Sequence, residues 1–342
     1  MYIISKLLFL SYDQITLIVG EFATQTCFQG RHGEEMGSDQ FGGQVMLHPP
    51  IRDQNLAVGR VSFVEFDYVG QAFRLGRYPF HVHLAGNSNA SYIKGCGIHN
   101  TFNRAVNIHG SHYVLVENNV AYNVMGGSIF LEDGVETGNV IKHNLVVGTK
   151  ESSSLLNDDI TPAAFWITHP SNLVEDNAAA GGSHFGFWYR LEATPRGPSF
   201  TTDVNPNHEK MGPGVGTFKG NTAHSLGRFG LWIFEMYFPR DNGLSSGEPK
   251  AVVFEKFTAW NCEKGAELVD GGAVQFKDFK MVNNHVGVEI KLIKEGDYYD
   301  TTGPLLMNTF ILGSTDVLGS ISSPVGVVLP LANRFVTIFY YL

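Results

Sequence analysis

A short strand-and-turn unit recurs along most of this 342-residue chain, and several copies carry an asparagine at the same place. In these copies an apolar residue and two further residues precede the asparagine, as in Val116-Glu117-Asn118-Asn119. A glycine-containing turn and a second short apolar strand follow each unit. Short strands that repeat with a fixed turn residue are typical of solenoids. The repeated asparagines are Asn119, Asn144, Asn177 and Asn221, with Phe257 and Phe279 at the same place in two later copies.

The second strands recur every 22 or 23 residues where no long loop intervenes. Val106 and Ile129 are 23 residues apart, and Phe165 and Phe187 are 22 apart. A β-sandwich would instead need hairpin turns such as Asn-Gly between its strands, and these are scarce. The repeat therefore predicts an all-β fold, a single-stranded parallel β-helix, with the asparagines stacked in a hydrogen-bonded ladder inside it. Gly/Pro-rich loop insertions are expected at residues 150–162, 192–214 and 239–250.

The two ends of the sequence set the expected boundaries of the solenoid. Residues 1–50 are predicted to be a partial N-terminal β segment, and residues 51–342 the parallel β-helix. The helix is expected to be truncated, because the chain stops within the apolar run FVTIFYYL. Lys6 and Asp13 interrupt the mildly apolar start, which makes it a poor transmembrane helix and a poor signal peptide. We expect a fragment of a longer chain, without a membrane span of its own.

Composition and charge narrow the class of partner. The formal net charge of −9 leaves no basic surplus for phosphates, so no nucleic-acid partner is expected. The three cysteines allow one disulfide at most, and the lack of a CxxC pair argues against a cysteine zinc site. Asn89-Ala90-Ser91 is a glycosylation sequon, which predicts a glycan on Asn89 of an extracellular chain.

Stacked coils turn sequence positions into columns of neighbours about 4.8 Å apart. In the second strands, alternate positions are apolar and belong to the core. The intervening positions include charges, which a packed core would not accept unpaired, so they must face outward. The first outward column reads His81, Asn107, Phe130, Trp166, Trp188, Trp232, Glu267 and Glu289. The second reads His83, His109, Glu132, Thr168, Arg190, Phe234, Val269 and Lys291.

The aromatic part of these columns has two interpretations. Flat rings stack on sugars while neighbouring polar groups bond to hydroxyls, which suits an extended glycan. Alternatively, the insertions fold over the rings and make them a second core. The substrate-binding candidates are Phe130, Trp166, Trp188, Arg190 and Trp232.

The histidine part of the columns is a candidate metal site. His83 and His109 should lie on consecutive coils, with His81 beside them on the same face. Imidazoles are common ligands of divalent cations, so His81, His83 and His109 are the predicted ligand set. A hydrogen-bonded stack without an ion is the alternative.

Glu132 and Asp133 are candidates for acid–base chemistry. Adjacent residues in a strand point apart, whereas a glycosidase places two carboxyls across one bond. A partner carboxylate would then have to come from Asp158, Asp159 or Glu235.

Several stretches of the chain resemble one family of cell-surface proteins. The chain is similar to the fibrocystin-L and fibrocystin family over about residues 35–335, and more distantly to the cell-migration-inducing and transmembrane cell surface hyaluronidases. The stretches that carry this resemblance include GRYPFHVHLAG (76–86), IHNTFNRAVNIHGSH (98–112), FLEDGVETGNV (130–140), SLLNDDITPAAFWITHPSN (154–172) and FGLWIFEMYFP (229–239).

The resemblance implies a right-handed parallel β-helix in the extracellular part of a large, membrane-anchored protein. It implies a receptor-like or coat protein that faces a glycan such as hyaluronan, or cell-surface proteins, without catalysis. The alternative that it implies is a hyaluronan-cleaving glycosidase. In that case His83, His109, Glu132 and Asp133 would be the catalytic residues, with a carboxylate as general acid and a histidine assisting.

Overall fold

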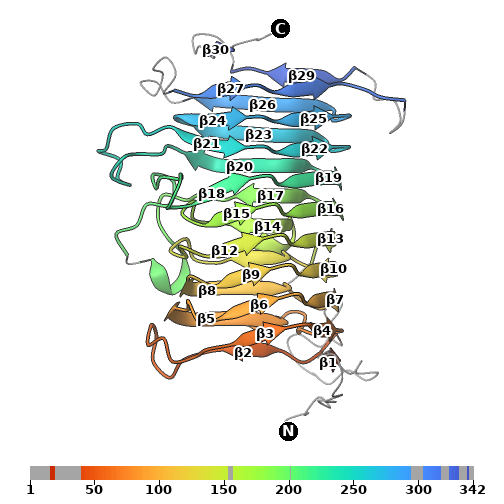
Figure 1. The fold of residues 1–342 in the computed structure, drawn as a ribbon, viewed down its shortest axis with the longest axis vertical. Coiled ribbons are helices and arrows are strands. Elements are labelled where there is room, and N and C mark those ends of the chain that lie inside the picture. Colours follow the sequence, from red (N-terminus) through yellow and green to blue (C-terminus); the bar gives the residue numbers. More distant parts are fainter. Residues whose placement is uncertain are drawn as a thin grey trace.

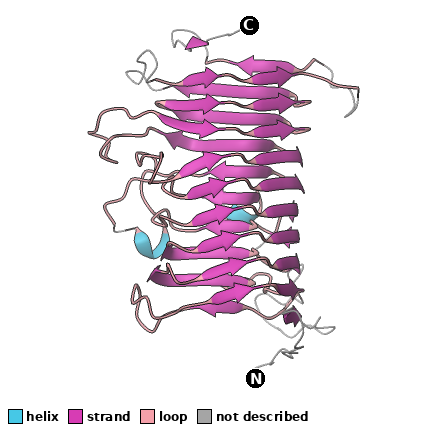
Figure 2. Ribbon diagram, viewed as in Figure 1, coloured by secondary structure: helices cyan, strands magenta, loops and turns pink. Residues whose placement is uncertain are grey.

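The computed structural model describes residues 16–19, 40–152, 157–200, 202–293, 303–316, 323–330 and 337–338. In these ranges the chain rises as a stack of coils, each built from three short strands (Figure 1). Nearly all its regular structure is strand (Figure 2). Two short 3-10 helices, η1 (Asn157–Asp159) and η2 (Gly197–Ser199), lie in the loop insertions.

The strands form three ten-stranded sheets in which hydrogen-bonded neighbours are three strands apart in the chain. The first sheet contains β1 (Thr16–Val19), β4 (Val64–Asp67), β7 (Gly97–Thr101), β10 (Val120–Met125), β13 (Leu145–Lys150), β16 (Ala178–Gly182), β19 (Thr222–Leu226), β22 (Thr258–Trp260), β25 (Lys280–Val282) and β28 (Phe310–Leu312). The second contains β2 (Val45–Leu47), β5 (Phe80–Asn87), β8 (Val106–His112), β11 (Ile129–Leu131), β14 (Ala163–Ile167), β17 (Phe185–Tyr189), β20 (Phe229–Tyr237), β23 (Lys264–Gly271), β26 (Val286–Ile293) and β29 (Val325–Val328). The third contains β3 (Arg60–Ser62), β6 (Tyr92–Lys94), β9 (Leu115–Glu117), β12 (Val140–Lys142), β15 (Leu173–Glu175), β18 (Thr217–Lys219), β21 (Val252–Glu255), β24 (Val274–Lys277), β27 (Leu305–Met307) and β30 (Thr337–Ile338).

Every coil thus gives one strand to each sheet, which is the architecture of a parallel β-helix and confirms the predicted fold class. The two strands β1 and β2 precede residue 51, and they pair in parallel with β4 and β5. The domain boundary at residue 50 stays a prediction. Within the described ranges, no helix is long and apolar enough to cross a membrane.

The predicted register of the second sheet is confirmed. Phe80 pairs with Val106, Val106 with Ile129, and Ile129 with Phe165, all with side chains in the main core. The intervening residues pair in the same way, from His81 and Asn107 to Trp188 and Trp232. Sequence spacing therefore placed these residues in the correct register, although the pairing shifts after His83 and after Ile233.

The predicted asparagine ladder is present and buried. Asn119, Asn144, Asn177 and Asn221 are each at most 2% exposed. The Nδ2 group of each of the first three donates to Oδ1 of the next, at 2.9, 3.0 and 3.1 Å. The same Oδ1 atoms accept backbone N–H groups, so the ladder also closes the turns.

Replacing Asn144 by leucine should lower the free energy of unfolding by about 1–3 kcal/mol, because it leaves buried polar groups unpaired. The Asn119 N–H groups and the Val116 carbonyl lose the Asn144 side chain, and Asn177 Oδ1 keeps only the backbone N–H of residue 144. Chemical denaturation measures the change, with Lys142→Gln, a surface change on the same coil, as control. Equal midpoints for Asn144→Leu and the control would contradict the structural role of the ladder.

A second, shorter ladder was not predicted. The Asn139 Nδ2 group donates to Asn172 Oδ1 at 3.0 Å, and Asn139 Oδ1 accepts the Val114 N–H at 2.9 Å. Asn139 and Asn172 are fully buried. Two members are too few to stand out as a repeat in the sequence.

The two described cysteines are small buried side chains, as expected. Cys96 and Cys262 are free thiols in the core. Burial raises the pKa of Cys262 to about 11, although backbone hydrogen bonds act against the shift. Cys27 lies outside the described residues.

Candidate functional site

Three consecutive coils bring the predicted polar residues together on the outward face of the second sheet. His81 and His83 belong to β5, and His109 belongs to β8. His83 pairs directly with His109 in the sheet. The next coil extends the register beyond β11, because the Glu132 N–H donates to the Ile108 carbonyl at 3.1 Å. The expected column of His83, His109 and Glu132 is therefore formed.

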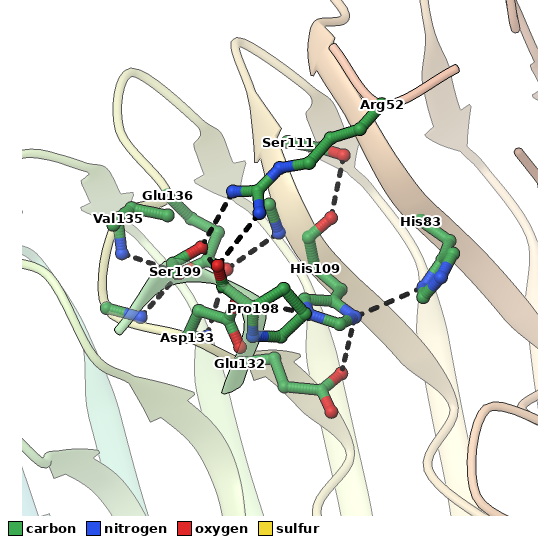
Figure 3. A network of polar contacts seen from close by, with 12 residues as sticks. Arg52, His83, His109, Ser111, Glu132, Asp133, Val135, Glu136, Pro198 and Ser199 are labelled. Carbon is green, nitrogen blue, oxygen red and sulfur yellow. Dashed lines mark hydrogen bonds and ion pairs between the residues drawn. The ribbon is translucent and has the colours of Figure 1, made fainter. Parts of the chain in front are cut away.

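His109 is the centre of this cluster (Figure 3). Its Nδ1 atom lies 3.1 Å from His83 Nδ1 and 3.6 Å from Glu132 Oε2. On the other side of the ring, Nε2 lies 3.1 Å from Asp133 Oδ2, although the N–H bond is not aimed straight at that oxygen. Both carboxylates thus contact one imidazole, through different nitrogens.

His81 lies deeper in the wall, with 1% of its surface exposed. Its Nδ1 atom is 3.0 Å from the Gly76 carbonyl oxygen, which can only accept a hydrogen bond. Its Nε2 atom is buried and has no hydrogen-bond partner in the described part of the chain. One nitrogen each from His81, His83 and His109 lie within 4.8 Å of one another.

The three histidines have different proton affinities. The pKa of His83 is lowered to about 4, mainly by burial and in smaller part by the neighbouring His109 and His48. Burial also lowers the pKa of His81 well below its usual value. Burial acts on His109 in the same direction, but the contact with Asp133 and the charge of Glu132 outweigh it and raise its pKa. His81 and His83 are therefore neutral at neutral pH, each with a nitrogen lone pair.

Two loops that are distant in sequence meet beside the cluster. Arg52 follows β2, and its Nη1 and Nη2 groups donate to the Pro198 carbonyl and to Ser199 Oγ at 2.9 and 3.1 Å. The Ser199 hydroxyl, at the end of η2, donates to Asp133 Oδ2 at 2.8 Å. The insertion at 192–214 therefore holds Asp133 against His109 and leaves its side chain 2% exposed (Figure 3). The exposed His48 ring lies 5.0 Å from the His83 ring at the edge of the cluster.

Glu136 supports the cluster and was not singled out in the sequence. It is fully buried, and its carboxylate accepts the N–H groups of Gly110, Asp133, Gly134 and Val135 at 2.8 to 3.1 Å. Burial raises its pKa, although the backbone hydrogen bonds oppose the rise. Glu136 therefore fixes the turn that carries Glu132 and Asp133. The stretch EDGVET contains three acids, and the sequence does not indicate which of them points inward.

The aromatic column forms a second core. Phe130 and Trp166 are 1% exposed and Trp188 is 3% exposed, whereas Trp232 and Phe234 are partly buried against them. The expectation of rings open to a sugar is therefore wrong for Phe130, Trp166 and Trp188. The alternative interpretation, a second core on the outward face, is correct.

Arginine side chains cover this second core. The Arg104 guanidinium carbon lies 3.6 Å from the centre of the Phe130 ring. The Arg190 guanidinium carbon lies 5.6 and 5.5 Å from the centres of the Trp166 and Trp188 rings. Asp159 and Asp158 of the 150–162 insertion pair with these arginines and hold their guanidinium groups beside the aromatic rings.

These insertion residues include the predicted partner carboxylates. Asp159 pairs with the fully buried Arg104 through two hydrogen bonds, at 2.9 and 3.2 Å. Asp158 forms ion pairs with Arg190 and Arg196, at 3.3 and 3.1 Å. Glu235 is exposed on β20. The two aspartates are therefore engaged in ion pairs with arginines.

Asn89 is exposed in the turn after β5, where its N–H donates to Asn87 Oδ1 at 3.2 Å. The predicted glycosylation site is thus accessible, and its modification stays a prediction.

Comparisons with known proteins agree with this architecture. A family model described as "CEMIP beta-helix" matches residues 40–231. Fibrocystin-L of Homo sapiens is 51% identical over 323 residues, which is 92% of this chain but 8% of that protein. The human cell surface hyaluronidase CEMIP2 is 30% identical over 64% of this chain and 17% of its own length. The human "cell migration-inducing and hyaluronan-binding protein" is 26% identical over 82% of this chain and 24% of its own length.

The chain therefore spans a small part of the relatives that it matches. The resemblance predicted from the HVHLAG, NIHGSH and FLEDG stretches is confirmed. With its three parallel sheets and the matching family model, the chain belongs to the CEMIP beta-helix family.

Proposed function

We propose that this chain is an extracellular β-helix of a fibrocystin-L-like cell-surface protein, and that it binds an acidic glycan such as hyaluronan without cleaving it. The observation that carries the proposal is the different exposure of the two carboxylates that contact His109. The Glu132 side chain is 19% exposed, whereas that of Asp133 is 2% exposed. Most glycosidases use two carboxyls that flank the scissile bond. In the described cluster beside His109, only the Glu132 carboxyl is accessible to a substrate.

The partners of each carboxylate support binding over catalysis. Asp133 accepts the Ser199 hydroxyl and contacts His109, and Asp159 is neutralised by Arg104. Glu132 accepts the Asn107 amide at 2.7 Å, so one of its oxygens is also engaged. Such contacts hold carboxylates in fixed positions and suit recognition through hydrogen bonds.

The edge of the cluster supplies cationic and neutral donors. Arg52 and Arg196 are half-buried at this edge, where they pair with Asp53 and Asp158 respectively, and a glycan carboxylate would compete for these pairings. Hydrogen bonds from arginine to carboxylates are strong and directional, so this edge suits the uronic acid groups of an acidic glycan. One relative is named as hyaluronan-binding, which makes hyaluronan the polymer to test first.

Replacing Arg52 by alanine should weaken retention of the chain on immobilised hyaluronan by about tenfold, the effect of one lost charge-assisted hydrogen bond. The matched control is Arg60→Ala, which removes an exposed arginine from β3 in the third sheet. Surface plasmon resonance with both variants measures the difference. If Arg52→Ala and Arg60→Ala bind as tightly as the parent chain, the proposed edge is not the binding site.

Hyaluronan hydrolysis is the second candidate function. It is favoured by the named hyaluronidase among the relatives and by Glu132, a partly exposed carboxylate beside two imidazoles. In that case Glu132 would be the general acid, assisted by His83 or His109. Loss of polymer length that disappears in Glu132→Gln would establish this function.

A further inference from the structure

We infer that His81, His83 and His109 bind one divalent transition-metal ion, with Glu132 as the fourth ligand. The ion would sit on the outward face of the second sheet, between β5, β8 and the end of β11. The inference concerns the ion alone and does not depend on glycan binding.

Two distances from His109 Nδ1 to other candidate ligand atoms are close to those of a tetrahedral site. Metal–nitrogen bonds of 2.0–2.1 Å place tetrahedral ligands about 3.3 Å apart. His109 Nδ1 lies 3.1 Å from His83 Nδ1 and 3.6 Å from Glu132 Oε2. The three histidine ligand atoms lie within 4.8 Å of one another, so the widest of these separations would shorten by up to about 1.5 Å around a bound ion.

The second nitrogen of two of the rings is already held by an acceptor. His81 Nδ1 donates to the Gly76 carbonyl, which leaves Nε2 as the lone-pair nitrogen. His109 Nε2 contacts Asp133, which leaves Nδ1 to face His83 and Glu132. A metal-binding histidine usually has its other nitrogen bonded to a carbonyl or a carboxylate, which fixes the ring. Asp133 is thus a positioning residue for His109.

A buried nitrogen without a partner is the independent observation. His81 Nε2 is buried and makes no hydrogen bond within the described residues. Such a group costs about 1–3 kcal/mol when it stays unsatisfied. A hydrogen-bonded stack would explain the contact between His83 and His109 but would leave this nitrogen unpaired. An ion at the common centre satisfies it.

The ligand types select the ion. Three imidazoles and one carboxylate suit Zn²⁺ and related transition metals, whereas Ca²⁺ and Mg²⁺ prefer all-oxygen sites. We therefore expect Zn²⁺ to bind and Ca²⁺ not to compete with it.

The test is the zinc content of the complete chain, produced without a histidine tag. The protein is treated with a chelator, incubated with Zn²⁺ and desalted, and its metal is measured by mass spectrometry. We expect one zinc per chain in the parent and in the control His184→Gln, and a loss of that zinc in His83→Ala/His109→Ala. Asp133→Asn should keep the site but weaken zinc binding by about 10–100-fold, the usual effect of a lost supporting contact.

A second measurement uses the parent chain alone, so it tests the inference even if the double variant fails to fold. Co²⁺ bound in a tetrahedral site absorbs visible light strongly, so the parent chain with Co²⁺ should turn blue and lose the colour when Zn²⁺ is added. No zinc retained by the folded parent, or equal zinc in the parent and the double variant, would overturn the inference. Because no glycan is present, the result is independent of hyaluronan binding.

Discussion

Replacing Arg104 by methionine should lower the free energy of unfolding by about 3–5 kcal/mol, the cost of breaking a buried ion pair. Asp159 would remain buried without its counter-charge, since Arg104 is fully buried and Asp159 is 2% exposed. The Phe130 ring would also lose the guanidinium that lies over it. Urea denaturation followed by tryptophan fluorescence measures the change.

The double variant Arg104→Met/Asp159→Leu is the matched control. Replacing both members of a buried pair by apolar residues is often neutral, so most of the lost stability should return. A single variant as stable as the parent would contradict the structural role of the pair. So would a double variant no more stable than the single one.

Replacing Trp166 by alanine should cost about 3–5 kcal/mol, as expected for a large aromatic side chain removed from a core. Trp166 is 1% exposed, and its ring centre lies 4.7 Å from that of Phe130 and 4.3 Å from that of Trp188. Thermal and urea denaturation measure the loss. The effect on hyaluronan retention should be no larger than the unfolded fraction explains.

Trp260→Ala is the control for this prediction. Trp260 is half-buried on β22 and stacks on His224 with 4.2 Å between ring centres. Its replacement should cost markedly less, because less surface is removed from a packed environment. A Trp166→Ala protein that keeps its stability but loses glycan binding would mean that Trp166 is a sugar platform after all.

The fold was predictable because a solenoid converts spacing into contact. An interval of 22 or 23 residues places Val106 beside Ile129, and alternation along the strand then assigns the outward face to His81 and His83. The asparagine ladder followed from the same stacking, since equal positions on successive coils must be neighbours. Local pattern and global fold agree here, which makes the prediction reliable.

The closed state of the aromatic column was not predictable to the same degree. It depends on where the insertions lie, and their sequences carry no period from which contacts can be deduced. Arg104 comes before β8 and Asp159 lies in η1, 55 residues later, yet the two form one buried pair. Periodicity showed that Phe130 faces outward, but the guanidinium that lies over its ring is held by this long-range pair.

The candidate site was predictable in position but not in detail. Register placed His83, His109 and Glu132 in one column, as the structure shows. Alternation along the strand predicted that Asp133 points away from Glu132. It did not predict that Asp133 contacts the opposite nitrogen of the His109 ring. Glu136 escaped notice because its partners are backbone N–H groups, which look the same at every position of a sequence.

The central claim is that this β-helix binds an acidic glycan and does not cleave it. The most direct test is the length of high-molecular-weight hyaluronan after incubation with the folded chain, at acid and neutral pH, with Ca²⁺ or Zn²⁺ present. We predict unchanged polymer length under conditions in which the same preparation is retained on immobilised hyaluronan. Shortened hyaluronan with the parent chain, and intact hyaluronan with Glu132→Gln, would contradict the claim.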